Sequence, residues 1–176
     1  GAAGLVGGIV RQHWGDRYRL RLADIQPISV LADHEESVEL DIRDLEAFTE
    51  ACRDVDVVLH LAADRSPSAD FYETLIDLNL IGCYNGFEAA RRSGCRRVVF
   101  ASSINAVLGY RGDQVVSWDV PVFPQNVYGA TKSFGEALGR VYADQHDVSC
   151  ISVRLGSPRF EQNGDWDPEK PSHEIS

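Results

Sequence analysis

The chain opens with G-A-A-G-L-V-G, which places glycines at Gly1, Gly4 and Gly7. Glycines at this spacing let the backbone approach a pyrophosphate group closely, and they leave amide N–H groups free at the start of a helix. Asp24 ends the next apolar stretch, about 20 residues further on, where a carboxylate can accept hydrogen bonds from the hydroxyls of an adenosine ribose. The glycines and Asp24 together predict a dinucleotide-binding site.

A glycine turn of this type normally follows a β-strand, yet the sequence begins at the first glycine. In a doubly wound sheet that strand is central and pairs on both sides. We therefore expect the functional protein to be longer at its N-terminus, so that this chain lacks the first strand of the sheet.

The composition favours one domain with a small-molecule ligand. The chain has 176 residues, of which 44% are hydrophobic, and this suits a single domain with a sizeable core. The net charge of −10 opposes binding to nucleic acid or to an anionic membrane. No apolar run approaches the ~18 to 20 residues that span a bilayer, so we expect no membrane partner.

The four cysteines are predicted to be buried small side chains. They lie far apart in the chain, without a C-x-x-C pair or a histidine at ligand spacing, so we expect no metal site and no disulfide. Free thiols of this kind favour a reducing, cytoplasmic location. The cysteines are Cys52, Cys83, Cys95 and Cys150.

Short apolar runs alternate with longer segments of helical period, which predicts an α/β fold with a doubly wound parallel sheet of the Rossmann type. The predicted strands lie near 18–24, 38–41, 55–61, 97–102 and 148–155. The predicted helices lie near 4–14, 44–53, 70–92 and 126–146, with Gly94 ending the third. Residues 103–125 are predicted to be a loop. We expect residues 1–157 to form the dinucleotide-binding domain, and 158–176 to lead into a substrate-binding part beyond the end of this sequence.

Tyr128 and Lys132 carry the most specific signal for chemistry. They lie one helical turn apart, so their side chains share a face, and the ammonium group is predicted to lower the pKa of the phenol from its usual value of about 10. A phenolate near neutral pH could act as a general base toward an alcohol. The alternatives are an exposed pair on a helix and, for the nearby Ser103, a helix cap or a turn residue.

Several segments together resemble the extended short-chain dehydrogenase/reductase family, the NAD-dependent epimerases and dehydratases. The resemblance covers residues 1 to about 157. It is carried by G-A-A-G-L-V-G, Asp24, His60-Leu61-Ala62-Ala63, Asn79 in L-N-L-I-G, Ser102-Ser103 and Tyr128-x-x-x-Lys132. Within that family, the segments F-A-S-S, Y-G-x-x-K-x-x-G-E and V-R-L-G-S look most like those of uronate dehydrogenases and related sugar-oxidising enzymes.

The resemblance implies NAD as the cofactor. It places Gly1, Gly4 and Gly7 at the pyrophosphate and Asp24 at the adenosine ribose, where a carboxylate repels the extra phosphate of NADP. The remaining cofactor-binding residues that it implies are Asp41 near the adenine, Ala62 and Ala63 along the cofactor trough, and Lys132 at a ribose.

The resemblance also implies a catalytic set. Tyr128 is the base, Lys132 is its electrostatic partner, and Ser103 donates a hydrogen bond to the reacting oxygen. Asn79 supports a water that relays protons, or else bonds to neighbouring backbone as a structural residue. The implied reaction is hydride transfer from a sugar hydroxyl carbon to NAD.

Residues after the serines bear on the substrate. Uronate dehydrogenases usually have Asn-His where this chain has Ile104 and Asn105, and the 4,6-dehydratases need an acidic pair there that Ile104 cannot supply. We take Ser103, Asn105 and Arg154 as candidate substrate-binding residues. Arg154 resembles an arginine that faces a substrate carboxylate, but a surface ion pair is an equal alternative. His60 is expected to bond to backbone.

Three functions follow from this sequence. The first is an NAD-dependent oxidoreductase acting on a sugar or a uronate-like sugar acid. The second is a nucleotide-sugar epimerase that uses the same side chains and regenerates NAD, and the third is a cofactor sensor without catalysis. The resemblance also implies a homodimer that forms through the helices at 70–92 and 126–146.

Overall fold

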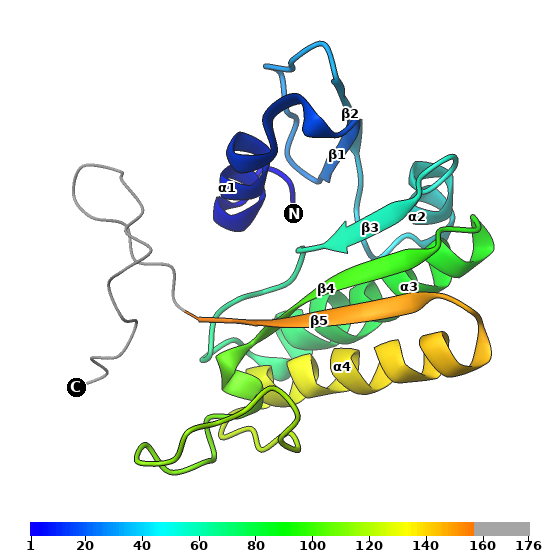
Figure 1. The fold of residues 1–176 in the computed structure, drawn as a ribbon. Coiled ribbons are helices and arrows are strands. Elements are labelled where there is room, and N and C mark those ends of the chain that lie inside the picture. Colours follow the sequence, from blue (N-terminus) through cyan, green and yellow to red (C-terminus); the bar gives the residue numbers. More distant parts are fainter. Residues whose placement is uncertain (157–176) are drawn as a thin grey trace, which may run out of the picture.

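The computed structural model describes residues 1–156, in which parallel strands alternate with helices (Figure 1). The strands are β1 (Leu20–Asp24), β2 (Glu35–Glu39), β3 (Val57–His60), β4 (Arg97–Ser103) and β5 (Ser149–Leu155). The helices are α1 (Leu5–Trp14), α2 (Leu45–Ala51), α3 (Gly82–Arg92) and α4 (Val127–Gln145), with a π-helical segment η2 (Phe71–Ile81) that runs into α3 and short 3₁₀ turns η1 (Gly15–Arg17) and η3 (Ile104–Ala106). The predicted α/β class is confirmed.

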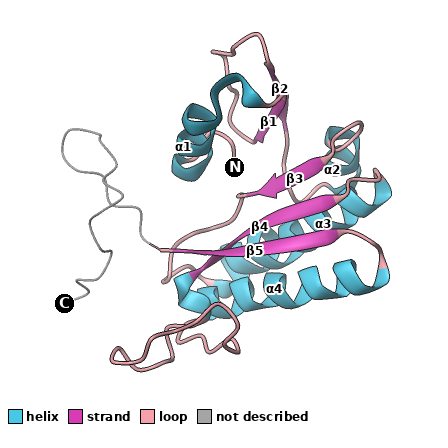
Figure 2. Cartoon of the chain, viewed as in Figure 1, coloured by secondary structure: helices cyan, strands magenta, loops and turns pink. Residues whose placement is uncertain are grey.

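Each predicted strand and helix is present, although some ends differ (Figure 2). The strand predicted near 38–41 is wrong in position, since β2 covers Glu35–Glu39, where glutamates on an exposed strand hide the apolar pattern. Tyr18, predicted inside the first strand, is 56% exposed and precedes β1. Gly94 follows the end of α3 with a φ of 74°, a left-handed conformation that glycine adopts without strain.

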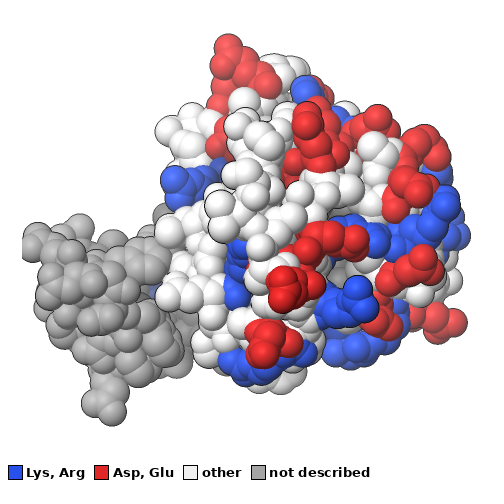
Figure 3. Space-filling view, turned by 90° about the horizontal axis from the view of Figure 1, so that it is seen from above, with Lys and Arg blue, Asp and Glu red and all other residues white. Residues whose placement is uncertain are grey.

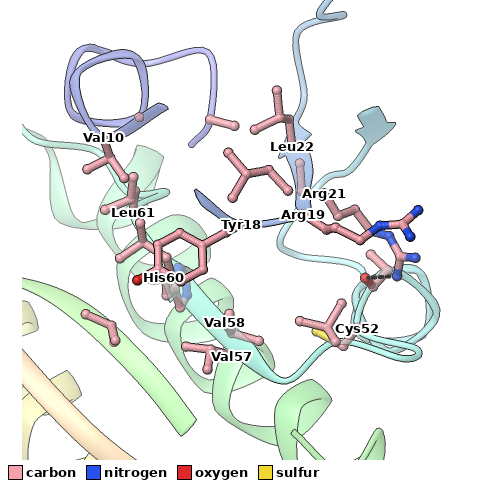
Figure 4. A pocket seen from close by; sticks show the side chains of 18 of the residues that line it. Val10, Tyr18, Arg19, Arg21, Leu22, Cys52, Val57, Val58, His60 and Leu61 are labelled. Atoms are coloured by element: carbon pink, nitrogen blue, oxygen red, sulfur yellow. Dashed lines mark hydrogen bonds between the residues drawn. The ribbon is translucent and has the colours of Figure 1, made fainter. Parts of the chain in front are cut away.

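The strands form two parallel sheets in the described residues. One sheet is β1–β2, and the other has the order β3–β4–β5, with Val57 opposite Arg97 and Arg97 opposite Ser149. A cavity of about 1110 Å³ lies between the sheets and is lined by Leu22 of β1 and Val58 of β3 (Figure 4). The two parallel sheets, with no strand between β1 and β3 among the described residues, agree with the predicted doubly wound arrangement lacking its central strand.

The core lies between the β3–β4–β5 sheet and the helices that pack on it. Phe87 of α3 is fully buried, and its ring lies 6.1 Å from that of Phe100 on β4 and 5.4 Å from that of Tyr142 on α4. Figure 1 shows α3 and α4 side by side along this sheet. Because β4 is the central strand and α4 packs against it, the residues at the end of β4 and at the start of α4 are held together.

The cysteines follow the sequence prediction in most respects. Cys52, Cys83 and Cys95 are buried free thiols, and Cys150 is a half-buried free thiol.

Among residues 1–156, no helix has both the length and the apolar character that crossing a bilayer requires. Acidic and basic side chains are interspersed over the face that Figure 3 presents, and ion pairs such as Arg92–Glu46 form between elements of the surface.

Candidate functional site

The glycine turn precedes α1 and is tightly folded. The N–H of Gly4 donates to the carbonyl of Gly1 at 3.2 Å, and Gly4 is the N-cap of α1 without a side-chain cap. A Cβ at Gly7 would lie 2.5 Å from the backbone oxygen of Ala2, and a Cβ at Gly1 would lie 2.7 Å from the Ala62 nitrogen. Glycine is therefore required at both positions, and the start of a ten-residue helix is left open to an anion.

Asp24 lies at the end of β1 and faces this turn. Its carboxylate accepts hydrogen bonds from the N–H groups of Ala3 and Gln26, each at 3.0 Å. Burial acts to raise the pKa of Asp24, but these backbone hydrogen bonds hold it below the ordinary value. The side chain is therefore ionised and fixed beside the glycine turn, as recognition of a ribose requires.

One cleft of about 790 Å³ brings most of the predicted site residues together. A cleft of this size suits a ligand that is larger than a sugar. The predicted residues that line it are Gly1, Gly4, Asp24, Asp41, Ala62, Ala63, Ser103, Asn105, Tyr128 and Lys132. Gly7, Asn79 and Arg154 do not line this cleft. The cleft thus joins the glycine turn to the Tyr128 phenol, which the sequence separates by more than 120 residues.

Tyr128 and Lys132 are both buried on α4, with 7% and 5% of their surfaces exposed, so the exposed-pair alternative is wrong. The Lys132 ammonium donates to the carbonyl of Ala101 at 3.0 Å and lies 5.7 Å from the centre of the Tyr128 ring. Burial lowers the pKa of Lys132 to about 8. The lysine is therefore close to the phenol but directed at the backbone of β4.

The predicted depression of the phenol pKa is wrong. Burial raises the pKa of Tyr128 above its ordinary value, and the negative charge of Asp64 acts in the same direction. The Ser103 hydroxyl acts against both effects. The spacing on the helix correctly predicts a shared face, but the loss of water around the phenol raises its pKa.

Ser103 belongs to a chain of hydrogen bonds that ends at α4. Its hydroxyl oxygen accepts from the N–H and the Nδ2 of Asn105, both at 3.1 Å, so it caps the 3₁₀ turn as the structural alternative predicts. Asn105 Oδ1 accepts from Asn126 Nδ2 at 2.8 Å, and Asn126 caps α4 by accepting from Gly129 N–H. A capping role does not remove Ser103 from the cleft, which it also lines.

Asn79 lies in the π-helical segment, 3% exposed, and its amide group is fully engaged. Its Oδ1 accepts from the Asp64 N–H at 2.8 Å, and its Nδ2 donates to the Asp64 carbonyl at 2.9 Å and to Thr131 Oγ1 at 3.1 Å. Asn79 therefore bonds to backbone, as its structural alternative predicts, but the partner is the Asp64 backbone in a distant loop and not the backbone of its own helix. It ties the loop after β3 to α4.

Arg154 forms an ion pair with Glu136 of α4. Its Nε and Nη2 donate to the two carboxylate oxygens at 2.9 and 2.8 Å, while its Nη1 is buried without a hydrogen-bond partner among the described residues. The side chains of Arg154 and Glu136 are 20% and 14% exposed, so this pair is half-buried and not at the surface. Of the two interpretations of Arg154, the ion pair is the one present.

His60 bonds to backbone, as predicted, with Nε2 lying 3.0 Å from the carbonyl oxygen of Gly82. Burial lowers its pKa to about 4, so the ring is neutral.

The sequence prediction missed three charged residues near the site. Asp64 and Arg65 line the cleft, and Glu136 is the partner of Arg154. Their signal in the sequence was weak, because charged residues in loops and helices are usually solvated.

Comparisons with known proteins agree with this geometry. A model of the NAD dependent epimerase/dehydratase family matches residues 1–169. The chain is 33% identical over 159 residues to uronate dehydrogenase of Pseudomonas putida, covering 89% of this chain and 59% of the relative. It is 35% identical over 175 residues to NAD-dependent glucose-6-phosphate dehydrogenase of Haloferax volcanii, covering 89% of this chain and 66% of the relative.

A solved structure has the same fold and carries the cofactor. Uronate dehydrogenase from Agrobacterium tumefaciens, a tyrosine-to-alanine mutant complexed with NAD, is 35% identical with a TM-score of 0.82. The similarity covers 92% of this chain and 62% of that one. The present chain therefore spans less than two thirds of the length of these relatives.

Proposed function

The chain belongs to the NAD-dependent epimerase/dehydratase family, and on that basis we propose that it is an NAD-dependent oxidoreductase. It takes a hydride from a hydroxyl-bearing carbon of a sugar or a uronate-like sugar acid. The observation that carries this proposal is the single cleft in which the glycine turn, Asp24 and Tyr128 meet. The names of the relatives, uronate dehydrogenase and glucose-6-phosphate dehydrogenase, support sugars as the substrate class.

The residues at one end of the cleft fit a dinucleotide. The open start of α1 and the close backbone approach at Gly1 and Gly4 suit the pyrophosphate, because amide N–H groups point toward an anion there. The ionised Asp24 would hold the adenosine ribose and disfavour NADP. Asp41, Ala62 and Ala63 line the same cleft and would contact the adenine side of the cofactor. When bound, NAD supplies the hydride acceptor.

The residues at the other end would manage the proton. Tyr128 would accept the proton of the substrate hydroxyl, and Ser103 would donate a hydrogen bond to the same oxygen as charge develops on it. Lys132, buried beside the phenol, would favour the phenolate by its positive charge and hold a cofactor ribose. Asn79 would act at a distance, by fixing the loop at Asp64 through its amide group.

Recognition of the sugar would use the residues around Ser103 and Asn105. Both line the cleft, and the hydrogen bond between them fixes the direction of the Ser103 hydroxyl. Arg154 would support this end of the cleft through Glu136 without touching the sugar, because it does not line the cleft and its Nη1 is buried.

An epimerase is the second candidate, since the family model includes epimerases and the same side chains would serve. The two functions differ in whether NADH accumulates. The test is to supply the full chain with NAD and either a panel of free uronic acids or a panel of nucleotide sugars, while recording the NADH absorbance band and the sugar products. Steady NADH growth with a uronic acid supports the dehydrogenase. Isomerised nucleotide sugar without NADH growth overturns it in favour of the epimerase.

The full protein would work as a homodimer in the cytoplasm. Apolar side chains are exposed along η2, α3 and α4, where two copies could pack their helices together; they are Tyr72, Ile81, Tyr84, Val127, Phe134 and Val141. Free thiols suit a reducing compartment. Sedimentation that finds only monomer at working concentration would contradict the dimer.

A further inference from the structure

The face of α4 that enters the cleft carries a third functional side chain. Tyr128, Lys132 and Glu136 follow one another at intervals of four residues, so they share one face of the helix. The first two line the cleft. The third lies one turn further along and contacts the ends of β4 and β5.

Glu136 joins these two strands to the helix. Its Oε1 accepts from Ser102 Oγ at 2.5 Å and from Arg154 Nε at 2.9 Å, and its Oε2 accepts from Arg154 Nη2 at 2.8 Å. Ser102 and Arg154 are directly opposite each other in the β4–β5 pairing. One carboxylate therefore holds a cross-strand pair, and Ser102 immediately precedes Ser103.

Several contacts hold α4 against its neighbours: Lys132 donates to the carbonyl of Ala101, and Thr131 Oγ1 accepts from Asn79 Nδ2. Gly135 packs against the ring of Phe100, and Gly129 packs against the carbonyl group of Asn105. Glu136 adds hydrogen bonds to β4 and β5 at once, and its bidentate pair with Arg154 has a strict geometry.

We propose that Glu136 is a positioning residue for the reaction. By holding Ser102 and Arg154, it sets the separation between the Tyr128 phenol and the Ser103 hydroxyl. These are the two groups that the proposed function places on the reacting oxygen, so this inference rests on that function. Glu136 touches neither substrate nor cofactor, and its effect is on the alignment of the two hydroxyl groups.

Two substitutions of Glu136 distinguish an effect on the alignment of the Tyr128 and Ser103 hydroxyl groups from an effect on the stability of the fold. Glu136→Gln keeps one acceptor oxygen and the shape of the side chain, whereas Glu136→Ala removes every hydrogen bond. Glu88 is a matched control, because it is 8% exposed, accepts from Arg91, Arg92 and Tyr142, and does not line the cleft. Glu88→Gln and Glu88→Ala therefore remove a comparable network away from the site.

Each variant of the full chain is assayed for kcat and KM, with kcat expressed per NAD-binding site to correct for unfolded protein. We expect Glu136→Ala to lower kcat by roughly 10- to 100-fold, because small misplacements of reacting groups have large effects. The Glu136→Gln value should lie between those of the alanine variant and the wild type. KM for NAD should stay within about twofold in both, since the residue lies outside the cofactor end of the cleft.

A second measurement does not depend on turnover. With ¹³Cζ-labelled tyrosine, the NMR resonance of Tyr128, assigned with Tyr128→Phe, should move in Glu136→Ala and stay in place in Glu88→Ala. The inference is overturned if Glu136→Ala leaves both kcat and this resonance unchanged, or if the Glu88 variants lower kcat per site equally. If the wild type oxidises no sugar, the proposed function fails, and the resonance alone still decides whether Glu136 positions Tyr128.

Discussion

Lys132 donates a hydrogen bond to the carbonyl of Ala101 at 3.0 Å, although it lies one helical turn from Tyr128. Its ammonium group is 5.7 Å from the centre of the phenol ring. The lysine is therefore bound to the backbone of β4, and burial is the main cause of the pKa shift of both side chains.

The buried Lys132 should make stability depend on alkaline pH. Its pKa is about 8 in the folded protein against 10.5 when exposed, so below pH 8 the folded state carries the cost of burying a charge. Between pH 8 and 10.5 the unfolded state binds more protons, and the free energy of unfolding rises with pH. The expected rise is about 3 kcal/mol relative to Lys132→Met, in which this group is absent. Urea titrations of the wild type and of Lys132→Met measure this rise. If the difference between their free energies of unfolding stayed constant from pH 8 to 10.5, the effect of burying Lys132 would be contradicted.

Asp64 should shift the pH dependence of catalysis. Its charge helps to raise the pKa of Tyr128, and Asp64→Asn removes that charge while keeping an oxygen for the N–H of Ser66. A base must be deprotonated to act, so activity rises with pH through the phenol pKa. We expect the rising limb of kcat/KM to move to lower pH in Asp64→Asn. If the rising limb of kcat/KM stayed at the same pH or moved to higher pH, the Tyr128 phenol would not be the group that controls this limb.

Gly7 and Gly8 offer a matched pair of substitutions in α1. In Gly7→Ala the new Cβ would lie 2.5 Å from the Ala2 oxygen and 2.7 Å from the Gly1 oxygen, so the turn must open. NAD affinity should fall by roughly tenfold or more, as measured by fluorescence titration. A Cβ at Gly8 meets nothing within 4 Å, so Gly8→Ala should bind NAD normally and gain about 0.5 to 1 kcal/mol of stability. Equal affinities in the two variants would contradict a role for this turn in NAD binding.

Asp24 should set the preference for NAD over NADP. Asp24→Asn keeps an oxygen that can accept from the backbone, but it loses the charge that opposes the extra phosphate of NADP. We expect the dissociation constant for NADP divided by that for NAD to fall by roughly tenfold, because NAD binding weakens and NADP binding improves. An unchanged ratio would mean that another residue faces the ribose.

The sequence predicts the parts of this site that depend on local spacing. Glycines at the start of a helix and an acid at the end of the next strand are typical of a dinucleotide turn, and the four-residue step from Tyr128 to Lys132 predicts a shared helix face. The order of strands and helices then indicates a parallel α/β fold. The placing of Gly4 and Tyr128 in one site comes from the resemblance to the epimerase/dehydratase family, and the structure has both residues lining one cleft.

What the sequence cannot provide depends on burial and on contacts between distant elements. The sign of the Tyr128 pKa shift follows from lost solvation, which spacing does not reveal. The pairing of Arg154 with Glu136 depends on the register of β4 and β5. Apolar periodicity also does not separate the π-helical turns of Phe71–Ile81 from ordinary α-helix, so the hydrogen bonds of Asn79 to the Asp64 loop could not be anticipated.

The central claim is that the Tyr128 phenol serves as the base for hydride transfer to NAD in the cleft. The most direct test measures sugar-dependent NADH formation and NAD binding side by side in the wild type and in Tyr128→Phe. We predict equal NAD affinity and a fall in kcat of roughly 10²- to 10⁴-fold in the variant, because only the proton-accepting oxygen is lost. A variant that binds NAD normally and forms NADH at the wild-type rate would contradict the claim.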